Sequence, residues 1–171
     1  MDTLVIMYLP LENITYQTKL NTKEIVDRLN EVVEPKKTFR MNGFFGNSEH
    51  KPYEGSIHNM SFKINRIIGY RNSFIPIITG TLEEEMNGTK VNVKMRLHSF
   101  VIVFIFIWFG GVGIASLAVI SYYLNNENFE PMSLIPFGIL IFGYAMVLGG
   151  FKYESIKSKK YLAKLFEAKI I

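Results

Sequence analysis

The arrangement of apolar and polar positions divides the chain into a polar part and two long uncharged segments. One segment runs from residue 98 to 124 and the other from 132 to 151. About 20 apolar residues in a helix, at about 1.5 Å each, cover the hydrocarbon core of a bilayer. Two helices that are apolar on every side inside a water-soluble protein would need a large shell, and the 97 residues before them mostly have strand patterns. The pattern therefore predicts two transmembrane helices.

Period-two alternation, which is typical of strands with one buried face, dominates the second half of the polar part. It covers residues 58–65 and 89–97, and residues 73–84 form a third candidate strand. Pro76 has no N–H for a ladder, so this third strand is expected at a sheet edge or a bulge. Asn87-Gly88 indicates a hairpin turn. We expect an antiparallel meander over residues 55–97.

Upstream of the meander, the patterns predict one helix and up to two more strands. The helix covers residues 21–35, with Asn21 as its N-cap and Glu24 three residues later. Residues 14–20 and 38–45 are expected strands, and residues 46–54 an expected loop. The fold class is thus an α+β membrane protein, in which a small antiparallel β-meander domain with one helix precedes a two-helix transmembrane hairpin and a C-terminal amphipathic helix. The expected division is a domain at 1–97, transmembrane helices at 98–124 and 132–151, a short loop at 125–131 and a basic helical tail at 152–171.

The distribution of basic residues predicts the orientation in the membrane. The loop between the two apolar segments contains Glu127 and Glu130 but no Lys or Arg, whereas six lysines follow the second segment. Basic residues flanking membrane spans stay on the cytoplasmic side. We therefore expect a two-pass protein of the inner (plasma) membrane with both termini in the cytoplasm. Two explanations of the tail lysines stay open: they only set the orientation in the membrane, or they also attract anionic lipid headgroups.

The tail also carries an apolar stripe. Leu162, Leu165, Phe166 and Ile170 recur at helical spacing between the lysines. Such a stripe suits docking on the domain, binding to the membrane surface or binding to a partner. We expect docking on the domain, because stripes of this kind most often pack within the same chain.

The apolar segments carry small residues and no ionisable ones. The absence of intramembrane charge argues against transport by this chain alone. Small residues allow helix backbones to approach closely. The candidates for helix packing are Gly110, Gly111, Ala115, Gly138 and Gly143. They suit packing within the hairpin and packing against another subunit equally well.

The polar part contains little catalytic chemistry. The chain has no cysteine, its three histidines show no metal-binding spacing, and Glu83, Glu84 and Glu85 stand beside a predicted turn. His58 is expected to be partly buried on the apolar side of its strand. Neither a phosphate-binding loop nor a nucleophile motif occurs. We expect no enzyme activity, no cofactor, no metal and no nucleic-acid partner.

One short segment, residues 66–74, places two arginines and a tyrosine around a tight connection. Guanidinium groups bind phosphates or carboxylates by paired hydrogen bonds. The alternative is that Arg71 and Asn72 are simply turn residues. With the nearby basic residues, the candidate contacts for lipid headgroups or a partner are Arg66, Tyr70, Arg71, Lys94, Arg96, Lys157, Lys159 and Lys160.

Two functional hypotheses follow. The first is a non-enzymatic membrane-anchored interaction or regulatory subunit, which assembles with itself or with another membrane protein. The second is a module that senses anionic lipid or a small ligand at the inner membrane surface. In both, the predicted strand at 89–97 continues almost directly into the first apolar segment, so the domain is expected to be coupled mechanically to that helix.

Overall fold

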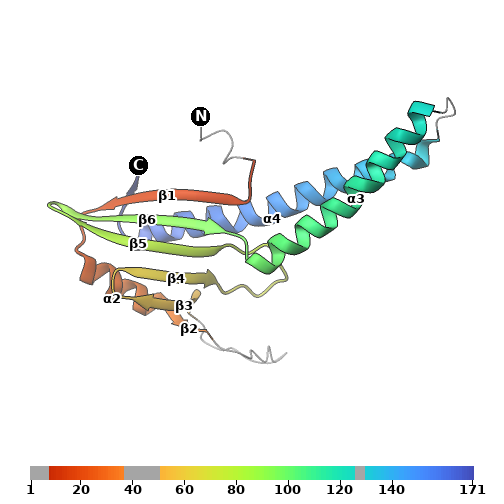
Figure 1. Ribbon diagram of the computed structural model, residues 1–171. Coiled ribbons are helices and arrows are strands. Elements are labelled where there is room, and N and C mark those ends of the chain that lie inside the picture. Colours follow the sequence, from red (N-terminus) through yellow and green to blue (C-terminus); the bar gives the residue numbers. More distant parts are fainter. Residues whose placement is uncertain (1–7, 37–50, 126–129) are drawn as a thin grey trace, which may run out of the picture.

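The computed structural model describes residues 8–36, 51–125 and 130–171. Within these residues a seven-stranded sheet stands at one end of a long helical hairpin (Figure 1). The strands are β1 (Leu11–Thr18), β2 (Val33–Pro35), β3 (Tyr53–His58), β4 (Ser61–Arg66), β5 (Ile77–Glu85), β6 (Gly88–Arg96) and β7 (Lys169–Ile170). The helices are α2 (Thr22–Val32), α3 (Ser99–Asn125) and α4 (Ile135–Leu165), and a 3₁₀ turn, η1 (Pro131–Leu134), precedes α4.

The strand order is β2-β3-β4-β5-β6-β1-β7. Neighbouring strands are antiparallel except β2 and β3, which are parallel. The predicted antiparallel meander is confirmed for β4, β5 and β6, and an additional strand that the patterns do not predict, β3, precedes them. The strand predicted at 14–20 exists as β1, shifted to 11–18, and pairs with β6 along its whole length. The sheet is larger than expected because of β3 and because β2 and β7 extend the two edges.

The first half of the meander differs from the sequence-based prediction. Residues 58–65 are not one strand, because the chain turns at Asn59, which has a φ of 44°. Met60 lies in this turn and is exposed, although it continues the alternation of Phe62 and Ile64. His58 ends β3 and is exposed, so its expected partial burial is wrong. The loop predicted at 46–54 is also wrong at its C-terminal end, because β3 begins at Tyr53. Residues 46–50 of that predicted loop lie outside the described part of the chain.

The second half of the meander is close to the prediction. β5 lies between β4 and β6, so the expected edge position is wrong; Pro76 is tolerated because it precedes the strand. The β5–β6 hairpin exists, but its turn residues are Met86 and Asn87. Gly88 already belongs to β6 and has a φ of 137°. A Cβ at this position would collide with the carbonyl oxygen of Thr18, so the close approach of β1 requires glycine.

Helix α2 begins as its sequence predicts. The backbone N–H of Glu24 donates to the side chain of Asn21 at 2.9 Å, and the backbone N–H of Asn21 donates to the carboxylate of Glu24 at 2.9 Å. This reciprocal pair is the capping box. The helix ends at Val32 rather than 35, because Val33 already belongs to β2. The strand predicted at 38–45 lies outside the described residues.

One face of the sheet is covered and the other is open. The inward side chains of the strands form one apolar core with residues of α2 and α4. In Figure 1, α4 runs behind strands β5, β6 and β1. The open face carries a polar row across four strands, from Lys63 through Thr79 and Lys94 to Asn13. Fully buried members of the core are Tyr16, Ile25, Leu29, Ile64, Ile78, Val91, Met95, Phe151, Leu162 and Phe166.

Helix α4 is continuous from the hairpin into this core. The separate tail helix predicted at 152–171 is wrong, because α4 extends to Leu165 and the chain ends with strand β7. The predicted docking of the tail on the domain is confirmed for Leu162 and Phe166, which are fully buried. Ile170 is exposed because it sits on the edge strand beside Tyr16.

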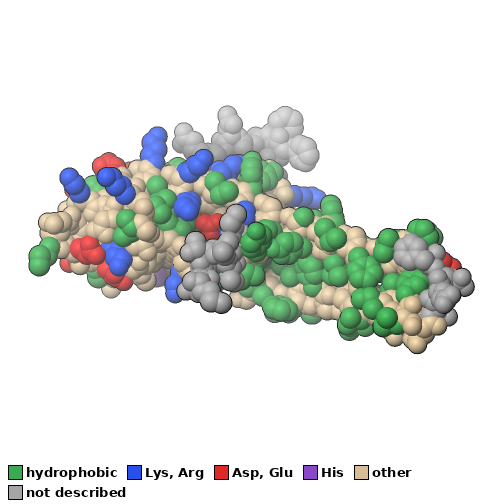
Figure 2. All heavy atoms as spheres, turned by 90° about the horizontal axis from the view of Figure 1, so that it is seen from above, with side chains coloured by type: hydrophobic (Ala, Val, Ile, Leu, Met, Phe, Trp, Pro, Cys, Tyr) green, Lys and Arg blue, Asp and Glu red, His purple; other side chains and the backbone are tan. Residues whose placement is uncertain are grey.

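Two helical segments, Ser99–Asn125 and Pro131–Leu165, are long and apolar enough to cross a membrane. Figure 2 shows hydrophobic side chains gathered over the hairpin and charged side chains over the domain. Only Leu97 and His98 separate β6 from α3. The domain is therefore joined to both helices of the hairpin without a flexible linker.

Candidate functional site at the junction of the sheet and the hairpin

The connection between β4 and β5 meets α4 at a buried carboxylate. Glu154 of α4 is fully buried. The guanidinium of Arg66, at the end of β4, donates to one oxygen of Glu154 at 2.9 Å, and the hydroxyl of Tyr70 donates to the other. A buried charge is tolerated only when it is paired and hydrogen-bonded. These two donors therefore fix the connection onto α4.

The same cluster includes Lys157, one turn further along α4. Its ammonium lies 3.9 Å from the ring centre of Tyr153 and 5.7 Å from that of Tyr70. Desolvation of the Tyr70 hydroxyl, followed by its hydrogen bond to Glu154, raises the pKa of Tyr70. The structure thus brings together three predicted contact residues, Arg66, Tyr70 and Lys157, and engages each with a group of the same chain.

A second attachment holds the β4–β5 connection against α4. The side-chain amide of Asn72 donates to the carbonyl oxygen of Gly150 at 3.1 Å, and its oxygen accepts from the backbone N–H of Phe74 at 2.9 Å. The second bond confirms Asn72 as a turn residue. A Cβ on Gly150 would lie 2.9 Å from Phe74 and 3.2 Å from Asn72, so this close contact depends on glycine.

Beside these attachments lies a groove of about 1130 Å³, larger than the ~300–1,000 Å³ of most small-ligand pockets. We call it the junction groove. Its polar end is formed by Tyr70, Arg71, Asn72, Ser73 and His98, and its apolar wall by Phe74, Phe100, Val101, Phe104, Met146 and Gly150. It therefore joins the start of α3, the adjoining part of α4 and the β4–β5 connection.

The polar end of the junction groove contains two side chains, Arg71 and His98, with donor groups that no described residue accepts from. Arg71 is exposed, and among the described residues it makes no hydrogen bond or ion pair. His98 accepts a hydrogen bond at Nδ1 from the backbone N–H of Phe100, at 3.2 Å. In the neutral ring this assigns the proton to Nε2, which remains able to donate.

The remaining predicted basic contacts lie elsewhere. Lys94 and Arg96 are exposed on the open face of β6, on the opposite side of the sheet from α4. The backbone carbonyl of Lys159 accepts a hydrogen bond from the buried Tyr16, and Lys160 is exposed on α4. The structure therefore does not bring the predicted headgroup contacts together in one place.

Of the five predicted helix-packing residues, only Gly143 lies in the contact between α3 and α4. A Cβ there would collide with the ring of Trp108. Around Gly110, Gly111 and Gly138, a Cβ would meet no described atom within 4 Å, and Ala115 is exposed. These four small residues face outward from the hairpin.

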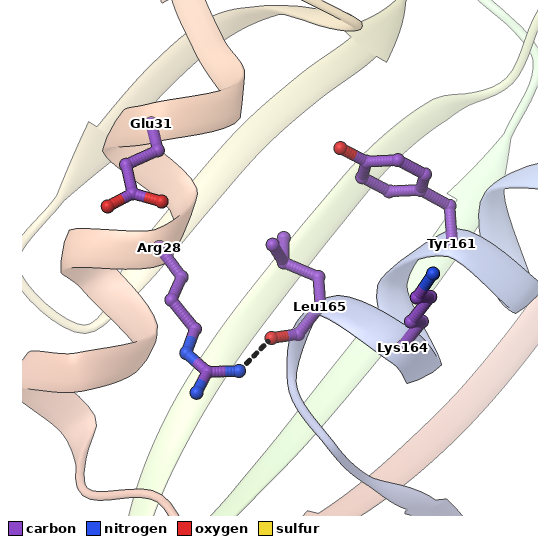
Figure 3. A pocket seen from close by; sticks show the side chains of 5 residues that line it. All are labelled: Arg28, Glu31, Tyr161, Lys164 and Leu165. Carbon is purple, nitrogen blue, oxygen red and sulfur yellow. Dashed lines mark hydrogen bonds between the residues drawn. The ribbon is translucent and has the colours of Figure 1, made fainter.

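A smaller hollow of about 380 Å³ lies between α2 and the end of α4 (Figure 3). Arg28 and Glu31 come from α2, and Tyr161, Lys164 and Leu165 come from α4. The guanidinium of Arg28 donates to the carbonyl oxygen of Leu165 at 2.8 Å and pairs with Glu167 at 2.7 Å. A cation bound to the last carbonyls of a helix stabilises its end. This hollow thus surrounds a contact that holds the tail in place.

Three residues of the junction, Glu154, His98 and Gly150, were not predicted from the sequence as site residues. Glu154 had a signal in the sequence, since it is an isolated acid within a basic segment. Gly150 lies at the end of the second apolar segment, and His98 lies just before the first. Nothing local indicates that these positions meet, because the contacts depend on the packing of α4 against the sheet.

The described residues contain no group of three or more His, Asp or Glu side chains able to hold a metal ion. Comparisons with protein-family models, with curated proteins and with solved structures found no match. By its fold, the protein is a single-sheet α+β domain built on a long apolar helical hairpin.

Proposed function

We propose that the protein is a non-enzymatic, membrane-anchored interaction or regulatory subunit. In this proposal the hairpin spans the plasma membrane, and the domain and both termini are cytoplasmic. The distribution of lysines and arginines around the apolar segments supports this orientation. The partner is a second copy of the chain or another membrane protein.

The observation that carries the proposal is the continuity of α4. This helix of 31 residues begins in the apolar hairpin and ends in the core of the domain, where Phe151 and Leu162 are fully buried. Lys152 pairs with Glu12 of β1 at 3.0 Å, which further ties the helix to the sheet. A shift of the hairpin would therefore move the sheet with it, as a coupling element requires.

The outward small residues of α3 support an interaction through the hairpin. Gly111 and Ala115 are four residues apart and therefore lie on one side of the helix. Pairs of small residues at this spacing allow another membrane helix to approach closely. Since neither residue is used in the contact with α4, this side is available to a partner helix.

The test is extraction of the full chain from its own membrane into lipid nanodiscs, followed by mass spectrometry of the co-purifying proteins. We expect a partner, or a second copy, at a fixed ratio. The double variant Gly111→Leu with Ala115→Leu is expected to lose it, because the added side chains prevent close approach. The control, Leu117→Phe, adds bulk at an outward position that is already large. Recovery of a strictly monomeric wild-type chain without any protein partner would overturn the proposal.

A further inference from the structure

We infer that the junction groove is a binding site for an anionic phospholipid of the surrounding bilayer. The inference rests on one part of the proposed function, the insertion of the hairpin into a membrane. It adds a ligand, and it narrows the eight predicted headgroup contacts to Arg71, with His98 as a second polar residue in the lining of the same groove.

The location of the groove matches the two chemical halves of a phospholipid. Its apolar wall comes from the first turns of α3 and from α4 near Met146. Phe100 is 74% exposed and Phe104 is 57% exposed, so the wall continues into the outward apolar surface of the hairpin. An acyl chain would lie along this wall. The polar end faces the domain, where a headgroup would leave the hydrocarbon region.

The charges at the polar end favour a phosphate group. Arg66 already serves the buried Glu154, whereas Arg71 is exposed and has no ion-pair partner among the described residues. A guanidinium binds phosphate oxygens by two parallel hydrogen bonds. The Nε2–H of His98 adds a donor at the same end. The described lining of the groove contains no acidic residue, so an additional negative charge on the headgroup is favourable.

The apolar wall distinguishes a lipid from a soluble phosphate compound. A soluble compound would use only Arg71 and His98 and would leave Phe100, Phe104 and Met146 without contacts. Burying apolar surface stabilises a complex by roughly 25 cal/mol per Å². The acyl chains are therefore expected to contribute to retention, and the headgroup to set selectivity.

The experiment uses the full chain in nanodiscs of phosphatidylcholine, with or without phosphatidylglycerol, and native mass spectrometry of the lipid retained after release. We expect the wild type to retain phosphatidylglycerol in preference to phosphatidylcholine. Arg71→Gln should lower this retention about tenfold, since a hydrogen bond to a charged group is worth about that factor. Met146→Trp, which fills the apolar wall, should lower retention of both lipids.

The matched control is Lys160→Gln, which removes the same charge at an exposed position of α4 outside the groove. It should leave retention unchanged. An equal loss in Lys160→Gln and Arg71→Gln would show diffuse attraction and overturn the inference, as would equal retention of the two lipids by the wild type. Displacement of the lipid by soluble glycerol phosphate would also overturn it, because the acyl chains would then contribute nothing.

Insertion across the bilayer is checked first in the same samples, by testing whether α3 and the apolar part of α4 are protected from added protease. A chain that does not insert would contradict the proposed function itself. A chain that inserts but shows no preference for phosphatidylglycerol would contradict only the lipid site. Circular dichroism of each variant shows whether the fold is retained.

Discussion

Helices α3 and α4 each contain a long apolar stretch, but the surroundings of the two helices are very different. In α3 the only buried residue is Ser116, whereas α4 buries seven residues, from Gly143 to Leu162. Four of the seven lie beyond Phe151, in the part of α4 that crosses the sheet. Among the described residues, helix α3 therefore contacts the core only through its first turns, with the partly buried Val101, Ile102 and Ile105. Helix α4 is at once a hairpin helix and a core element of the domain.

The polar residues of the two helices show where this difference arises. Ser116 donates to the carbonyl of Val112 in its own helix, so it needs no other partner. In α4, by contrast, Glu154 and Ser155 are buried and bond to groups of the sheet domain. The apolar stretches alone do not distinguish the two helices; α4 differs by the charged and polar residues that follow Phe151. Two buried polar residues that bond to the domain, Glu154 and Ser155, mark where α4 leaves the hairpin and enters the core.

The largest loss of stability is expected from removing the side chain of Phe151 in α4. Phe151 is fully buried between α4 and the sheet, so Phe151→Ala should lower the free energy of unfolding by about 3–5 kcal/mol. The matched change in α3 is Phe106→Ala, at a position that is 75% exposed. Denaturant titration of the full chain in micelles measures both. Similar losses in the two variants would contradict the distinct roles of the helices.

The next largest loss of stability is expected from breaking the ion pair that attaches the β4–β5 connection to α4. Arg66→Ala leaves the buried carboxylate of Glu154 without its cation, and should cost about 3 kcal/mol of unfolding free energy. Arg71→Ala removes the same charge from a nearby exposed position that has no ion-pair partner among the described residues, and should change stability by less than about 0.5 kcal/mol. Equal melting temperatures of the two variants would show that the pair does not hold the connection.

The features that the sequence predicts correctly are local. The capping box at Asn21 and Glu24 needs only three residues of separation. Strand β6 follows from simple alternation. Strand β5 lies within the third candidate segment but begins at Ile77 rather than at residue 73, and the turn after it is displaced by one residue. The docking of Leu162 and Phe166 follows from helical spacing of apolar residues.

The features that the sequence does not predict depend on distant partners. Strand β7 is two residues long and exists only because β1 offers a free edge. The junction forms from residues far apart in the chain, since Arg66 and Glu154 are separated by 88 positions. No periodicity encodes such a meeting. For the same reason, the sequence could identify Arg66 and Arg71 as candidates but could not show that Arg66 pairs with Glu154, whereas Arg71 has no ion-pair partner in the described part of the chain.

A smaller effect is expected at alkaline pH from Tyr53, which packs on Tyr161 of α4 at a ring-centre distance of 5.3 Å. Burial raises the pKa of Tyr53 from 10.0 to about 12. Between pH 10 and pH 12 the unfolded chain loses the tyrosine proton while the folded chain keeps it. The contribution of Tyr53 to stability is therefore fully present below pH 10 and is lost as the pH rises toward 12. At about 1.4 kcal/mol per pH unit, the loss approaches roughly 2 kcal/mol.

Tyr53→Phe should remove this part of the alkaline loss, as measured by unfolding free energies at a series of pH values from 8 to 12. Some loss should remain, because burial also raises the pKa of Tyr16. An alkaline profile identical to that of the wild type would show that the Tyr53 hydroxyl is not enclosed between α4 and the sheet.

The smallest change in stability, about 1 kcal/mol, is expected from alanine substitutions at the adjacent glycines Gly149 and Gly150. One substitution should stabilise the protein and the other should destabilise it. Replacing an exposed helical glycine by alanine stabilises a helix by up to about 1 kcal/mol. Gly149→Ala should show this gain, because its Cβ would meet no described atom within 4 Å. Gly150→Ala should instead lose about 1 kcal/mol, since its Cβ would press on Phe74 at 2.9 Å and on Asn72 at 3.2 Å. Thermal unfolding of both variants in micelles measures the difference. A gain in both would mean that the β4–β5 connection can move away from α4 at little cost, and that the junction groove is not held in one shape.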